Sequence, residues 1–227
     1  MMTDGRVTRV TAERFIDTML ALIVESGGSQ DVNLRQIARR IGCAHTNCYN
    51  YFASYEHLRW AAFRRALRLY GEYLVHDLDD SLAPHDFLQR LVTNLATYPE
   101  ENQGLYRFIA SDPIDLEAIP EDILVSVSAM KTWLFAVMEV AYAPDLSAAA
   151  AERTANIVLA YIDGETLNLI NGRVVPGEDV KGRVVENTML LIKELGATAA
   201  NGRRAGEGAN RHVSYPVLDL TGIEGGT

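Results

Sequence analysis

The chain has 227 residues, 48% of them hydrophobic, with two cysteines and a formal net charge of −9. This length and composition are typical of a globular protein with one domain of ordinary size plus a small one, and two cysteines imply no disulfide framework. No apolar run is long enough to cross a bilayer, and residues 1–10 lack the apolar core of a signal peptide. We therefore expect a cytoplasmic protein with no membrane partner.

Charge is distributed unevenly along the chain. Residues 1–69 contain 10 Arg or Lys and 6 Asp or Glu, whereas residues 70–227 contain 11 and 24. A basic excess at one end of an acidic chain is a hint of nucleic-acid binding. An acidic second domain is compatible with this hint, because the field of the DNA backbone is screened over about 10 Å at moderate salt.

The N-terminal region predicts a group of three helices. Thr11 can cap a first helix that runs to about residue 25. Asn33, with Gln36 three residues later, predicts a near-capping box for a second helix that ends at Gly42, where a left-handed C-cap is favoured. A short third helix is expected over residues 44–51.

The third of these helices has the surface of a nucleic-acid reader. Only Cys48 and one face of Tyr51 suit a core, and no acidic residue occurs from residue 32 to 55. Asn, Thr and His can contact base edges, and Tyr can donate to phosphate. The predicted DNA-binding residues are Asn33, Arg35, Arg39, Ala44, His45, Thr46, Asn47, Tyr49, Asn50, Tyr51 and Tyr55. Arg40 and an N-terminal arm with Arg6 and Arg9 are further candidates for phosphate contacts.

The rest of the chain predicts helices and no strands. Ser54 caps a helix to about residue 78, and later helices are expected over residues 86–98, 120–142, 148–171 and 178–195, with a short segment that starts at Pro99. Residues 120–142 are apolar nearly all round and are expected to be the most buried element. Residues 199–227 predict a flexible tail, in which the apolar stretch 213–218 could dock on the body at a place that the sequence does not give.

The helix pair resembles the helix-turn-helix of the TetR family of bacterial and archaeal regulators. The matching residues are Ile37-Ala38, Gly42, Tyr49 to Phe52, Ser54 and Leu58. The sequence departs from the family pattern at Tyr51, where His is common, and at Tyr55, where Lys is common. The resemblance implies an all-α protein with an N-terminal three-helix DNA-binding domain (1–57) and a larger helical ligand-binding and dimerisation domain (58–198).

The resemblance also implies a function and its partners. A homodimer, paired through residues 148–171 and 178–195, would bind double-stranded DNA at a pseudo-palindromic operator. It would act as a repressor that an unknown small-molecule effector releases. Candidate ligand-binding residues in the second domain are Tyr98, Tyr106, Trp133, Tyr161 and Asn168. A core position is favoured for any one of them, whereas the set as a whole favours a cavity slightly.

Several alternatives remain open from the sequence. Asp163 and Glu165 would favour a cationic ligand or lie at a wet dimer face. Cys43-x-His45-x-x-Cys48 could be a metal or redox site, although a packing role for both cysteines is favoured. The sequence has no Gly-rich phosphate loop, metal-spaced His pair or nucleophile elbow, so we expect no enzyme, cofactor or metal. The other functional readings are an all-α small-molecule-binding protein and a regulator controlled by a protein partner that docks on the tail.

Overall fold

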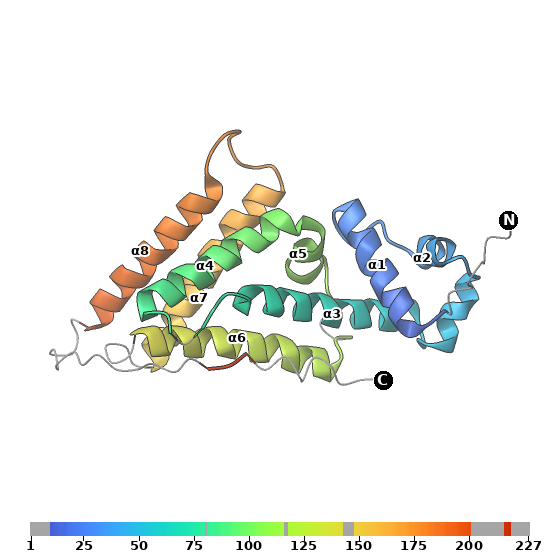
Figure 1. The fold of residues 1–227 in the computed structure, drawn as a ribbon, viewed down its shortest axis with the longest axis horizontal. Helices are drawn as coiled ribbons and strands as arrows, with labels where there is room; N and C mark the ends of the chain where they lie inside the picture. Colours follow the sequence, from blue (N-terminus) through green and yellow to red (C-terminus); the bar gives the residue numbers. More distant parts are fainter. Residues whose placement is uncertain (1–9, 80, 116–117, 143–147, 201–215, 219–227) are drawn as a thin grey trace. The chain divides into compact units, whose positions relative to one another are not determined.

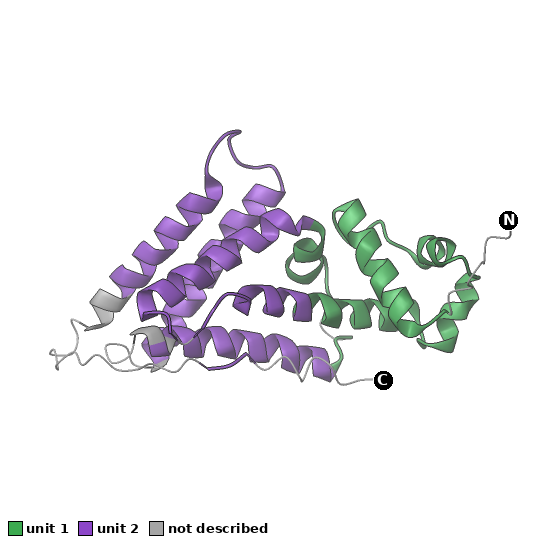
Figure 2. Ribbon diagram, in the orientation of Figure 1, with its two compact units in different colours: residues 1–67, 104–120 green, residues 68–103, 121–227 purple. Residues whose placement is uncertain are grey.

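A computed structural model describes residues 10–79, 81–115, 118–142, 148–200 and 216–218. All regular secondary structure in these ranges is helical, as expected from the sequence. In the same ranges, no helix is both long enough and apolar enough to span a membrane. The chain forms two compact units, which Figure 2 colours separately: residues 1–67 with 104–120, and residues 68–103 with 121–227.

The first unit is built from helices that are not all consecutive in the chain. It contains α1 (Ala12–Ser26), α2 (Leu34–Ile41), the 3₁₀ helix η1 (His45–Asn50), the first part of α3 (Tyr55–Val75) and α5 (Gln103–Ala110) (Figure 1). The inclusion of α5 was not predicted. The domain boundary expected between residues 57 and 58 stays a prediction.

The core of the first unit centres on α1. Phe15, Met19 and Ile23 of its buried stripe have no exposed surface. On α5, a Cβ atom at Gly104 would overlap the backbone carbonyl of Ile23, so α5 approaches α1 at a distance that only glycine permits. The Arg107 guanidinium also donates to the carbonyl oxygen of Gly27 at 2.9 Å. Both contacts hold α5 against the C-terminal end of α1.

The second unit is a bundle of α4 (Pro84–Glu101), α6 (Glu121–Tyr142), α7 (Ala148–Ile170), α8 (Val180–Ala200) and the end of α3. Within it, α7 packs against α4, α6 and α8, and α4 also packs against α6 and α8. The shared core is aliphatic and aromatic, and its most deeply buried members include Leu74, Leu88, Leu91, Val137, Val158 and Ile192.

Two expectations about these helices were wrong. The helix expected over residues 86–98 continues through Pro99 to Glu101. Proline in the last turn removes one backbone hydrogen bond, but the turn still closes, because the Asn102 N–H donates to the Tyr98 carbonyl at 2.8 Å. In α6, which was expected to be the most buried element, Leu124 is 50% exposed and Val127 is 39% exposed. Hydrophobic composition alone does not indicate which faces of a helix are covered by neighbours.

Candidate nucleic-acid interface

Helix α2 has the start and end that its sequence predicts. The Asn33 side chain accepts from the Gln36 N–H at 3.1 Å, and the Gln36 side chain accepts from the Asn33 N–H at 2.9 Å. Gly42 ends the helix with φ 83°. The helix buries Ile37 and the apolar residues that share its face, so Asn33, Arg35 and Arg39 project from the exposed side. The capping box and the glycine stop therefore fix which arginines face solvent.

The expected helix over residues 44–51 is a tighter 3₁₀ helix, η1, which begins after Ala44 and ends before Tyr51. Only Cys48 in it is buried, and Tyr49 is 53% exposed. Side chains three residues apart eclipse one another in a 3₁₀ helix. The exposed or half-buried polar residues are His45, Thr46, Asn47, Tyr49 and Asn50. The geometry thus stacks Thr46 with Tyr49 and Asn47 with Asn50 in two columns on the surface of η1.

Aromatic packing holds η1 in place, because so short a helix is not stable alone. The Phe15 ring lies 5.9 Å from the Tyr51 ring and 6.4 Å from the Phe52 ring, centroid to centroid. The Tyr51 hydroxyl donates to the Val10 carbonyl at 2.7 Å. The start of α3 is capped by Ser54, whose hydroxyl oxygen accepts from the His57 N–H at 3.2 Å.

Two of the predicted phosphate contacts already use their protons within the protein. The Tyr55 hydroxyl donates to the Val32 carbonyl at 2.6 Å, and burial raises the pKa of Tyr55. Tyr51 donates to Val10 in the same way. A phosphate oxygen accepts hydrogen bonds but cannot donate them. DNA contacts from Tyr51 and Tyr55 therefore require these internal bonds to exchange, and both contacts stay predictions.

The three arginines of α2 differ in their surroundings. Arg40 pairs with Glu25, with a distance of 2.6 Å from Nη2 to Oε1, and this partner lowers the pKa of the Glu25 carboxyl. Arg35 and Arg39 are exposed and form no ion pair with the part of the chain that the structure describes. Arg35 and Arg39 are thus better placed than Arg40 for phosphate. The expected arm with Arg6 and Arg9 lies outside the described residues.

The surroundings of Cys43 and Cys48 favour a packing role over a metal or redox site. Cys48 is fully buried and its thiol pKa is raised, chiefly by loss of solvent, which disfavours the reactive thiolate. Cys43 is half-buried in the turn after α2. Among the described residues, no group of three or more His, Cys, Asp or Glu could hold a metal ion.

Known proteins resemble this chain in sequence over part of its length. An uncharacterized HTH-type transcriptional regulator of Mycobacterium tuberculosis is 27% identical over 102 residues. This alignment covers 45% of the present chain and 50% of the relative, so the chain spans about half the length of the curated relatives it matches. No family model matches the chain.

Solved structures resemble it over most of its length. A TetR-family regulator from Streptomyces coelicolor aligns with a TM-score of 0.64 at 15% identity, over 88% of this chain and 90% of that structure. The chain has the fold of the TetR-family transcriptional regulators. A TetR variant from Acinetobacter baumannii in complex with minocycline aligns with a TM-score of 0.56 at 14% identity, over 84% and 99% of the two chains.

The five ligand-binding candidates are divided between the two units and differ in burial. Tyr106 lies in the unit of α1 and α5, whereas the other four lie in the second unit. Trp133 is 5% exposed, Tyr98 is 2% exposed, and Asn168 is exposed on α7. The half-buried Tyr161 accepts from the Asn187 amide at 2.8 Å. A ligand role for these residues stays a prediction.

Polar groups in the second unit largely serve its own structure. The buried Asn94 amide donates to the Leu74 carbonyl at 3.0 Å and to Asp77 at 2.8 Å, which ties α4 to the end of α3. Tyr98 is different, because its hydroxyl is buried and has no hydrogen-bond partner among the described residues. Its ring lies 4.8 Å from that of Tyr70, and burial raises the pKa of Tyr98.

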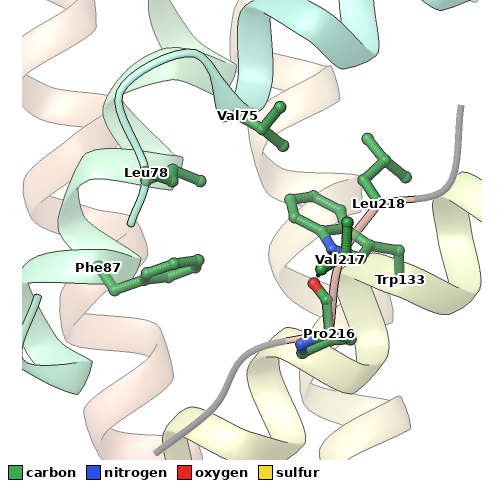
Figure 3. A pocket seen from close by; sticks show the side chains of 7 residues that line it. All are labelled: Val75, Leu78, Phe87, Trp133, Pro216, Val217 and Leu218. Atoms are coloured by element: carbon green, nitrogen blue, oxygen red, sulfur yellow. Dashed lines mark hydrogen bonds between the residues drawn. The ribbon is translucent and has the colours of Figure 1, made fainter. Parts of the chain in front are cut away.

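A cavity in the second unit is lined mostly by residues that were not among the ligand-binding candidates. It has a volume of about 220 Å³ and is drawn in Figure 3. Its lining consists of Val75, Leu78, Phe87, Trp133, Pro216, Val217 and Leu218. Trp133 is the one ligand-binding candidate among them. An apolar residue gives no sequence signal that separates a cavity wall from a core position.

Proposed function

We propose that this chain is a sequence-specific DNA-binding transcriptional regulator that reads DNA with the exposed face of η1. The observation that carries the proposal is the division of this short helix into one buried residue, Cys48, and a polar surface with no carboxylate. A helix that served packing alone would have no need to expose so many hydrogen-bonding groups. Arg35 and Arg39 of α2, which are exposed and form no ion pair with the described residues, supply positive charge beside that surface.

The chemistry of this surface suits a major groove. The amides of Asn47 and Asn50 can form paired hydrogen bonds with adenine, and Thr46 or His45 can contact other base edges. Phosphate contacts from arginine set the register without reading sequence. In the proposed complex η1 supplies the base contacts, and α2 supplies backbone contacts through Arg39 and Arg35.

The proposed regulator is a homodimer formed through residues 148–171 and 178–195. The exposed side of α7 carries Ile157, 41% exposed, with Ala160 and Gly164 further along the same face. Leu190 of α8 is 55% exposed. Small and apolar residues at these positions would allow two helix pairs to approach closely. Sedimentation of an Ile157→Asp, Leu190→Asp variant checks this: a shift from dimer to monomer is expected.

The regulator is further proposed to be a repressor that a small molecule releases. Support comes from the apolar cavity in the second unit and from the helix α3, which has residues in both units. A change from mostly bound to mostly free DNA requires a differential affinity of about 5.5 kcal/mol between the two states. In a dimer, two ligand sites would share this requirement.

The test is selection from a random pool of double-stranded DNA. The parent is compared with a His45→Ala, Tyr49→Ala variant and with a matched control, His85→Ala, Gln89→Ala, which changes exposed residues of α4 in the second unit. We expect a two-fold-symmetric motif from the parent and the control, with half-sites about one helical turn apart or slightly more. The η1 variant should recover no motif.

Two outcomes would count against the proposal. If nothing is enriched above background at low salt, DNA binding is excluded and a small-molecule-binding role for the helical body becomes the better account. If the η1 variant recovers the same motif as the parent, DNA is read elsewhere on the protein.

A further inference from the structure

The cavity of the second unit has one wall that is distant in the sequence from the others. Val75 and Leu78 come from the end of α3 and the turn after it, Phe87 from α4, and Trp133 from α6. The remaining wall is residues 216–218, here called the strap. In Figure 3 the strap lies against Trp133, and the Phe87 ring faces them across the open space.

The described contacts of the strap are polar at Pro216 and apolar at Leu218. The Trp133 Nε1–H donates to the Pro216 carbonyl at 2.7 Å. Leu218 packs against the core of the second unit, whereas Val217 is 88% exposed. Of the apolar stretch 213–218, only residues 216–218 are described, and they dock on Trp133 and the core of the second unit. Among the described contacts, one hydrogen bond and one partly buried side chain attach the strap, and a ligand can displace both.

The lining chemistry limits what the cavity can hold. All seven lining residues are apolar. The Nε1–H of Trp133 is the one polar hydrogen among their side chains, and it already donates to the Pro216 carbonyl of the strap. A charge placed there would lose its hydration without gaining a partner, which is costly. A cationic ligand does not suit this cavity, because neither the exposed Asp163 nor Glu165, which pairs with Arg183 at 2.9 Å, lines it.

The volume suits a ligand of one ring. An engineered apolar cavity of about 150 Å³ is large enough to take up benzene. The present cavity, at about 220 Å³, leaves room for a ring with a short apolar substituent while the strap is in place.

We propose that residues 216–218 form the movable wall of a binding site for a small, neutral, apolar ligand, in contact with Phe87 and Trp133. The ligand site rests on the cavity alone, and its regulatory meaning rests on the proposed function. When the strap no longer covers it, a bound ring exposes on the order of 50 Å² of apolar surface. At about 25 cal/mol per Å², this exposure corresponds to roughly tenfold weaker binding.

The probe for the test is fluorobenzene, titrated with the full chain and followed by fluorine NMR. We expect binding by the parent, roughly tenfold weaker binding by Pro216→Gly, Leu218→Gly, and no binding by Val75→Phe, whose added ring fills the cavity. Val175→Ser, at a position that is 63% exposed away from the cavity lining, is the matched control and should bind like the parent. Thermal unfolding of each variant checks that it is folded.

Charged rings of the same size make the ligand class testable. Benzoate and benzylammonium should bind at least about tenfold more weakly than fluorobenzene, because neither charge has a partner. Equal binding of a charged ring, or unchanged affinity in the folded strap variant, would overturn the proposal. So would a parent that binds no fluorobenzene. The parent's DNA selection is independent of this titration, so a failure of the ligand site and a failure of the DNA-binding function are distinguishable.

Discussion

The exposed face of η1 and the cavity of the second unit are opposite kinds of surface. The first is convex and polar, and residues close together in the sequence build it. The second is concave and apolar, and four separate segments build it. The comparison shows that a surface can be assigned from sequence when its chemistry is local, whereas a cavity depends on which distant segments meet. Substitutions of exposed polar residues should change DNA binding, whereas substitutions of the buried residues beneath them should change the free energy of unfolding.

The largest expected effect is on the support beneath the polar face. Phe15→Ala removes a fully buried ring that packs against Tyr51 and Phe52. Loss of such a ring should lower the free energy of unfolding by about 3–5 kcal/mol. Urea denaturation measures it, with Asp31→Ala, an exposed position, as the control. A change of less than about 1 kcal/mol would contradict the packing described for η1.

A smaller effect is expected on the polar face itself, and it should spare stability. His45→Ala or Asn47→Ala should reduce discrimination between bases at one or two positions of the operator by about 1–3 kcal/mol. Unfolding free energies should stay within about 0.5 kcal/mol of the parent, since these residues are not part of the core. Binding to single-base variants of the selected DNA provides the measurement. An equal loss on all sequences would remove the base-reading role.

Neighbouring arginines of α2 offer an internal comparison. Arg39→Ala should weaken binding to all DNA sequences alike and reduce the slope of log K against log salt by about 1. Arg40→Ala should change the slope by clearly less, because its charge is paired with Glu25. Titrations at several salt concentrations check both. If the two variants behave identically, the Arg40–Glu25 pair does not persist in the complex.

The smallest effect concerns pH and lies in the second unit. Burial, with the hydrogen bond to Glu101, raises the pKa of Tyr73 to about 12, whereas a tyrosine in an unfolded chain ionises near pH 10. The neutral phenol is favoured by folding, so this contribution to stability is complete below about pH 10 and is lost as pH rises toward 12. Denaturation of the parent and Tyr73→Phe at pH 9 and pH 11 tests this. We expect the parent to lose more stability than the variant, and parallel losses would contradict it.

The helix-turn-helix was predictable because its signals are local. Asn33 with Gln36, the glycine at position 42 and Ser54 each fix one helix end within four residues, and all three are confirmed in the structure. The shape of η1 as a 3₁₀ helix was not predicted. Eight residues with one buried side chain carry too little periodicity to separate a 3₁₀ helix from an α-helix.

Features that depend on tertiary contact were not predictable in the same way. The packing of α5 on α1 depends on the close approach at Gly104, and a lone glycine inside a helical pattern does not name its partner. The sequence pointed to a docking tail but not to Trp133 as the residue that donates a hydrogen bond to it. The charges of Asp163 and Glu165 left a cationic ligand and a wet dimer face both open, because sequence does not show that one carboxylate is exposed and the other paired.

The central claim is that η1 contacts the bases of DNA, and site-specific crosslinking tests it most directly. A photoreactive benzophenone side chain would replace Tyr49, and in a separate control protein it would replace His85 of α4. Both proteins would be irradiated with the selected operator. The account predicts crosslinks from position 49 to bases within each half-site and none from position 85. Crosslinks from position 85 alone, or none from position 49 in a protein that still binds the operator, would contradict it.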